Sequence, residues 1–148
     1  MNDADWSKIE FFKPSEFVRD PTRVHFDLVD MLDEMRRTAG VPIKIHEAWA
    51  PDGHAKNSAH YAGLAVDFHF VGWPLLDQWL FAERFPWQGI GIYPYWNNPG
   101  LHVDLRLAGH EHIRLGRRWY RDRNNKYRAL NRGLFNLLLS GSAPRNLS

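Results

Sequence analysis

Alternation of apolar and polar residues predicts two short β-strands in the chain, over residues 66–70 and 101–105. Every second side chain in each segment is apolar, which is the pattern of a half-buried strand. Because successive side chains of a strand point to opposite faces, the polar residues of each segment share one face. If both strands belong to one sheet, these polar residues converge. They are Asp67, His69, His102 and Asp104.

Other segments predict helices and further strands around this pair. Apolar residues recur at helical spacing over residues 25–38, and Gly40 follows as a C-terminal cap. We also predict strands over 41–45 and 89–93, a helix over 74–85 that opens on Pro74, and a last helix over 130–139. The predicted fold class is α+β, with a small, mostly antiparallel central sheet flanked by helices.

Length and composition limit the class of protein. The 148 residues fit one domain, with a core over about 9–139 and a flexible tail over 140–148. The chain has no cysteine, which excludes disulfides and thiolate metal ligands. No apolar run reaches membrane-spanning length, and the acidic N-terminus lacks the features of a signal peptide. We expect synthesis in a bacterial cytoplasm, and a cell-wall target would then imply release in a phage or prophage context.

The shared polar face carries the residue types of a metal site. Two imidazoles and one carboxylate are a ligand set that holds a catalytic zinc ion and leaves one position for water. His60 lies in the loop before the first strand, where Gly63 permits a tight turn, and would reach the face of Asp67 and His102. The simpler interpretation is a solvated sheet face, although such faces usually carry Lys, Thr, Glu or Arg.

The segment from Ser58 to Asp67 resembles the Ser-x-His-x-x-Gly-x-Ala-x-Asp motif of the zinc D-alanyl-D-alanine carboxypeptidases, peptidase family M15. That family shares its core with lysostaphin-type endopeptidases and the hedgehog signalling domain. The resemblance continues at Gly89 to Pro94 and Leu101 to Arg106, and covers about residues 9–106. It implies that His60, Asp67 and His102 bind one zinc ion per chain. It also implies a peptidoglycan stem peptide as the substrate.

The chain departs from that family where the usual catalytic partners stand. Many members carry an acidic base three residues before the last histidine, and others carry a histidine two residues before it. Here these positions hold Pro99 and Gly100, and residues 46–50 lack the arginine with which many members position a substrate carboxylate. Asp104 and Glu47 are therefore the candidate bases, although Asp104 is equally suited to holding an imidazole or an arginine.

Polar and aromatic residues in the loops beside the proposed ligands are candidates for substrate binding. His54 and Ser58 precede the first ligand, and Tyr95 and Trp96 precede the last one. The two aromatic side chains would line a cleft, or would cover the edges of a small sheet instead.

The expected function is zinc-dependent hydrolysis of peptidoglycan peptide bonds through a metal-activated water. The bond would lie at a D-alanyl-D-alanine end, or inside the stem peptide as in endolysin-type L-alanyl-D-glutamate peptidases. The alternative is a catalytically inactive zinc-binding domain of the same fold with a structural or binding role, such as a phage component.

Residues 106–132 are rich in arginine and aromatic residues, a composition that also suits a nucleic-acid surface. We favour a solvated hairpin with Asn124 and Asn125 at its turn and its arginines facing water, because no recognised nucleic-acid motif is present. We therefore do not expect nucleic acid as the partner, and we expect no membrane-spanning segment.

Overall fold

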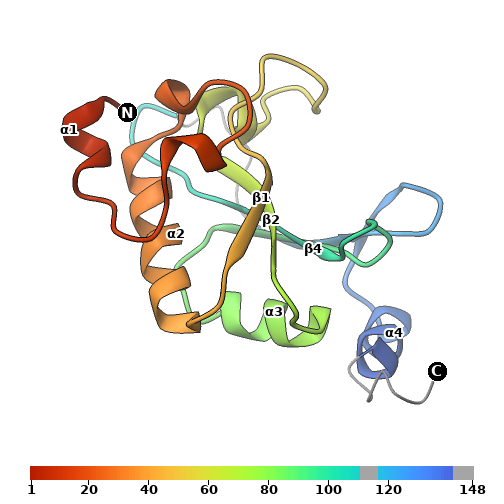
Figure 1. Cartoon of the computed structure of the whole chain (residues 1–148). Helices are drawn as coiled ribbons and strands as arrows, with labels where there is room; N and C mark the ends of the chain where they lie inside the picture. The colour runs from red at the N-terminus through yellow and green to blue at the C-terminus, as the bar shows by residue number, and fades with distance from the viewer. Residues whose placement is uncertain (111–116, 142–148) are drawn as a thin grey trace.

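One sheet of six strands organises the computed structural model, which describes residues 1–110 and 117–141 (Figure 1). The strand order is β1-β2-β4-β3-β5-β6, and every neighbouring pair is antiparallel except β3 and β5. The predicted α+β class with a mostly antiparallel sheet is thus confirmed. The strands are β1 (Ile43–Glu47), β2 (Ala65–Phe70), β3 (Gly89–Tyr93), β4 (Gly100–Asp104), β5 (Arg118–Arg121) and β6 (Tyr127–Ala129).

The three predicted helices are present with shifted ends, and the short helix α1 was not predicted. The side chain of His25 accepts a hydrogen bond at the start of α2, and Gly40 ends this helix with a left-handed φ of 70°. α3 is shorter than predicted, because it begins after Pro74 and ends at Ala82. The described helices are α1 (Asp3–Trp6), α2 (Phe26–Ala39), α3 (Leu75–Ala82) and α4 (Arg132–Gly141).

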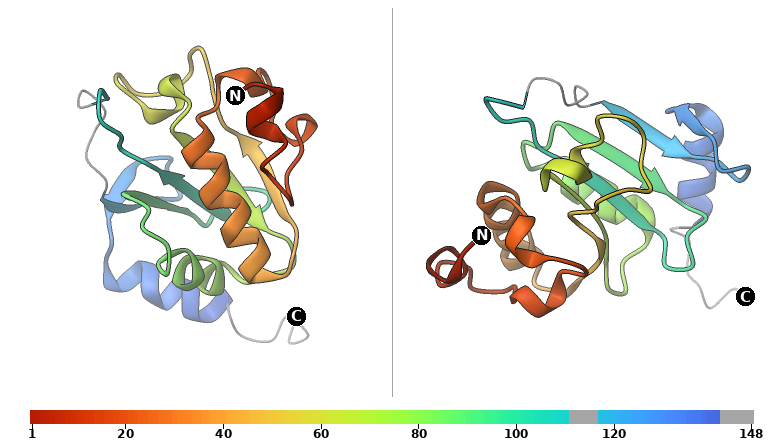
Figure 2. Two further views of the ribbon diagram at one scale, coloured as in Figure 1. Left: turned by 90° about the vertical axis from the view of Figure 1, so that its left-hand side faces the viewer. Right: turned by 90° about the horizontal axis from the view of Figure 1, so that it is seen from above.

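The apolar face of the sheet packs against α2 and α3 and forms the core. Leu28 and Leu32 of α2, Trp79 of α3 and Phe68 of β2 belong to one buried cluster. Figure 2 shows α2 lying against the strands and α4 beside α3. The rings of Trp79 and Phe135, on α3 and α4, lie 5.5 Å apart. Among the described residues, no helix combines the length and apolar character needed to cross a bilayer.

The opposite face of the sheet is left open by α2 and α3, and two glycines of β3 shape it. A Cβ atom on Gly89 would lie 2.2 Å from the Asp104 carboxylate, and one on Gly91 would lie 2.5 Å from the Trp119 ring. These distances are too short for any side chain at either position. At these two positions β3 therefore contributes bare backbone, over which Asp104 of β4 and Trp119 of β5 lie.

The predicted hairpin is confirmed, because β5 and β6 pair antiparallel around residues 122–126. Asn125 has a φ of 59° in this turn, a left-handed value that asparagine tolerates. The predicted strand over 41–45 starts two residues later, at Ile43, because Pro42 has no N–H for the ladder. Most of the predicted tail over 140–148 lies outside the described residues.

Candidate metal centre

His60, Asp67 and His102 converge on the open face of the sheet, as predicted from strand alternation for Asp67 and His102 and from the preceding loop for His60. Asp67 of β2 and His102 of β4 are directly opposite each other across the strand pair. Oδ1 of Asp67 lies 2.9 Å from Nδ1 of His102 and 3.3 Å from Nε2 of His60. One ligand atom from each residue lies within 4.8 Å of the others, so the group can hold a metal ion.

Local hydrogen bonds place His60 on a 3-10 turn, Ala59–Ala62, before β2. The Ser58 hydroxyl accepts from the His60 backbone N–H at 3.2 Å, so this predicted substrate residue also caps the turn. Gly63 ends the turn at a φ of 70°, and a Cβ there would lie 2.0 Å from a backbone oxygen. Nδ1 of His60 donates to the Ala48 carbonyl at 2.6 Å, which leaves Nε2 directed at Asp67.

The imidazole of His102 is held between two carboxylates. Its Nε2 donates to Oδ2 of Asp104 at 2.8 Å, while its Nδ1 faces Asp67. Asp104 thus contacts the nitrogen that is turned away from Asp67. A carboxylate on the second nitrogen is the usual way in which a ligand imidazole is oriented in a metal site. Asp104 is suited to positioning His102, whereas its role as a base stays a prediction.

Electrostatics couple the same three groups. Burial by itself would lower the pKa of His102, but the hydrogen bonds to Asp104 and Asp67 outweigh burial and raise this pKa to about 9. Burial would raise the pKa of Asp67, but His60 and His102 hold it well below its usual range. A metal ion that binds here must displace the proton of His102.

Glu47 and His54 form a second polar pair beside the proposed ligands. Nε2 of His54 lies 2.5 Å from Oε1 of Glu47, and the His54 ring stacks on the His60 ring with centroids 4.1 Å apart. Atoms of Glu47, His54 and His60 also lie within 4.8 Å of one another. Tyr61 fixes the loop, because its hydroxyl donates to the His54 carbonyl and accepts from the His54 N–H.

His69 lies on the open face but contacts a different histidine. Its Nδ1 lies 2.7 Å from Nε2 of His46, and the His46 ring lies 5.4 Å from Trp96. Burial is the main reason why the pKa values of both imidazoles are lowered. A β-bulge between Ile45 and Glu47 sets this part of the edge strand, and no simple sequence pattern predicts such a pair.

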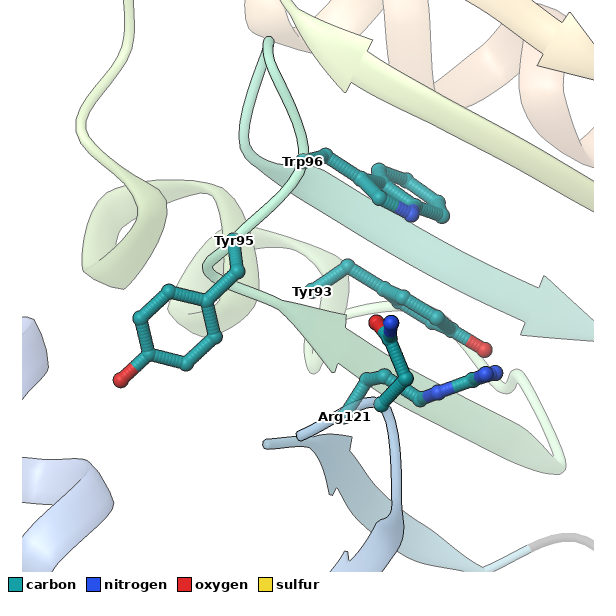
Figure 3. Close-up of a pocket in the computed structure, with 5 residues that line it drawn as sticks. Tyr93, Tyr95, Trp96 and Arg121 are labelled. Carbon is teal, nitrogen blue, oxygen red and sulfur yellow. The ribbon is translucent and has the colours of Figure 1, made fainter. Parts of the chain in front are cut away.

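The three proposed ligands lie on a cleft of about 520 Å³. One wall is the loop over residues 53–59, and the other is the β5–β6 hairpin. A smaller hollow of about 160 Å³ adjoins it and shares Tyr93, Trp96 and Arg121 with it (Figure 3). Of the four predicted substrate residues, His54, Ser58 and Trp96 line the cleft and Tyr95 lines the smaller hollow.

The interpretation that the hairpin arginines simply face water does not hold for Arg118 and Arg121, which are half-buried, whereas Arg117 is exposed at the cleft. Arg117 and Arg121 line the cleft on either side of Trp119, whose ring lies 5.1 Å from that of His102. The guanidinium group of Arg118 forms an ion pair with Glu83 at 2.7 Å. Strand alternation predicts that neighbouring arginines of β5 point to opposite faces. Only the pairing of β5 with β3 shows which of these faces lies beside the proposed ligands.

Comparisons with protein-family models, with curated proteins and with solved structures found no match to this chain. The likeness to zinc peptidases therefore rests on the motif residues themselves and on where they lie. The hedgehog-like core and the peptidase activity stay predictions.

Proposed function

We propose that this protein is a zinc-dependent peptidase that hydrolyses peptide bonds of peptidoglycan, on a hedgehog-like core. The observation that carries the proposal is the convergence of His60, Asp67 and His102 on a cleft with room for a peptide. The substrate class comes from the motif resemblance, since nothing in the geometry itself distinguishes one peptide from another.

The donor set fits zinc. It offers two imidazole nitrogens and one carboxylate oxygen, and the cleft leaves space for a fourth ligand. The other nitrogen of each imidazole already has a partner, the Ala48 carbonyl for His60 and Asp104 for His102. Such partners fix the ring orientation that a metal needs. When bound, zinc would supply a Lewis acid and an activated water.

Glu47 is the proposed general base. Its carboxylate lies beside His60 and is oriented by Nε2 of His54. In this proposal Glu47 accepts a proton from the attacking water and then passes it to the leaving amine. His54 keeps the carboxylate in place through both transfers. Asp104 does not take part in proton transfer and acts by orienting His102.

A metal-binding domain without peptidase activity is the second candidate. It is favoured by Pro99 and Gly100, which stand where many members of the resembled family carry a base or a histidine. The two candidates share the zinc site and differ only in turnover. Metal binding and hydrolysis must therefore be measured separately.

Metal content by mass spectrometry tests the shared premise, on protein purified without a histidine tag. We expect about one zinc ion per chain in the wild type and a loss of zinc in His102→Ala. His69→Ala is the matched control, because His69 lies on the same face but contacts His46. Wild-type protein without zinc affinity, or His102→Ala with full affinity, would refute the metal centre.

Turnover is then measured as loss of turbidity of chloroform-treated bacterial cells and as release of peptides from purified peptidoglycan. Clearing by the zinc-loaded protein, lost in His102→Ala, supports the peptidase. Zinc binding without clearing across several wall types supports the inactive domain instead.

A further inference from the structure

The face of β5 that meets the proposed ligands carries Trp119 and Arg121, and Arg117 directly precedes this strand. Alternate side chains of a strand share a face, so Arg121 lies on the same side as Trp119. The Trp119 ring covers Gly91 and lies 5.1 Å from the His102 ring. Both arginines line the same cleft as His102. Two guanidinium groups therefore flank the wall nearest to the metal group.

These two arginines differ from their neighbours in charge balance. Arg118 pairs with Glu83, and Arg128 pairs with Asp122 at 2.8 Å. Over residues 1–110 and 117–141, no carboxylate forms an ion pair with Arg117 or Arg121. The carboxylates that line the cleft are Asp67 and Asp104, and both already bind imidazoles. This wall of the cleft is therefore positively charged.

Arg121 also has a buried donor without a partner. Its Nη1 donates to the Tyr127 hydroxyl at 2.7 Å, but its Nε–H is buried and has no hydrogen-bond partner among the described residues. An unsatisfied buried N–H group is costly, but protein atoms cover this nitrogen, so it is not the atom that meets a ligand in the cleft. In Figure 3, Arg121 lies beside Tyr93, whose ring stacks on Trp96 with centroids 4.1 Å apart.

We propose that Arg117 and Arg121 form a subsite for a carboxylate of a peptide substrate whose scissile bond lies over the metal group. Planar guanidinium groups match the geometry of a carboxylate and bind it through paired hydrogen bonds. The stacked Tyr93 and Trp96 offer an apolar surface for the adjoining residue of the peptide. This inference rests on the proposed peptidase function and adds the charge of the substrate to it.

A nucleic acid fits this arrangement less well than a peptide carboxylate. Nucleic-acid binding needs a track of arginines and lysines that neutralises several phosphates. Here Glu83 and Asp122 neutralise two of the four arginines that line the cleft. The two that remain line the cleft at either side of Trp119.

Peptide binding to the metal-free, full-length protein tests the subsite without turnover. The probe is an N-acetylated tripeptide that ends in D-alanyl-D-alanine, as the free acid and as the C-terminal amide. Binding is followed by calorimetry and by tryptophan fluorescence, since Trp96 and Trp119 line the cleft. We expect the free acid to bind about tenfold more tightly than the amide, because only the acid offers a charged acceptor.

Arginine variants assign this preference to the proposed residues. Arg117→Ala and Arg121→Ala should each reduce the preference for the free acid to about threefold or less. Arg123→Ala is the control, because Arg123 is an exposed arginine of the same hairpin that does not line the cleft. Arg117 is exposed, so its variant remains informative even if Arg121→Ala is destabilised.

Three results would overturn the subsite. They are absence of measurable binding of the free acid, equal affinity for acid and amide, and a preference that both arginine variants retain. Tighter binding of inorganic phosphate or a short single-stranded DNA than of the free acid would overturn the choice of a carboxylate. A zinc-loaded protein that hydrolyses nothing would instead refute the proposed activity, while this binding result would stand.

Discussion

Replacing Asp104 tests whether the second nitrogen of His102 governs metal binding. Nε2 of His102 donates to the Asp104 carboxylate at 2.8 Å, and the Asp104 side chain is only 11% exposed. Asparagine at this position keeps an acceptor but removes the charge. Alanine removes both, so the ring is no longer held with Nδ1 towards Asp67.

Loss of such a partner lowers metal affinity by about 10–100-fold. We expect Asp104→Asn near the lower end of that range and Asp104→Ala near about 100-fold, because the alanine variant loses orientation as well as charge. Zinc affinity is measured by competition with a chromogenic chelator at fixed pH. Asp30→Asn, an exposed position in the middle of α2, is the control, and His102→Ala marks the loss of a ligand.

Wild-type zinc affinity in Asp104→Ala would refute this reasoning. It would mean that the Nε2 contact does not orient the ring, and that Asp104 is free for another role. A normal zinc affinity combined with lost hydrolysis would point to Asp104 as the base in place of Glu47.

Four further predictions concern the site and the sheet. Glu47→Gln should keep bound zinc but lower the hydrolysis rate by about 10²–10⁴-fold, and a retained rate would exclude Glu47 as the base. Gly91→Ala places a Cβ 2.5 Å from the Trp119 ring, so urea unfolding should show a loss of about 1–3 kcal/mol; Gly141→Ala, with open space around it, should show much less. The thermal stability of the metal-free protein should fall as pH rises from 6.5 through about 9, because the raised pKa of His102 stabilises the protonated fold and that contribution disappears on deprotonation. The rise in melting temperature on adding zinc should grow over the same pH range, because a smaller fraction of His102 is protonated and must lose its proton when zinc binds. A melting temperature that does not fall, or an equal fall in His102→Ala, would contradict this assignment.

Strand alternation was sufficient to predict which polar residues share a face. Asp67, His69, His102 and Asp104 all lie on the open side. Successive side chains of a strand point to opposite faces, so a residue whose two neighbours are buried in the core must point to the open face. The small-residue turn at Gly63 was also readable, since it needs a left-handed φ. Both features depend only on residues close together in the sequence, so they can be predicted without knowledge of the rest of the fold.

The roles of individual side chains were not readable in the same way. Asp104 could contact either Nδ1 or Nε2 of His102. Which nitrogen it contacts depends on the rotation of the His102 ring and on the space that Gly89 leaves for the Asp104 carboxylate. The pairing of His46 with His69 depends on a bulge, and the position of Arg117 depends on parallel pairing between β3 and β5. These are contacts between distant parts of the chain.

The strand order separates two tasks along the chain. All three proposed metal ligands come from residues 60–102, whereas the charged wall of the cleft comes from residues 117–129 at one edge of the sheet. An edge hairpin is joined to the rest of the sheet along one side only, so its sequence can change while the ligand strands keep their register. A different hairpin grafted onto this edge, with Trp119 kept against His102, would change the charge of the cleft wall and leave the proposed ligand strands in place.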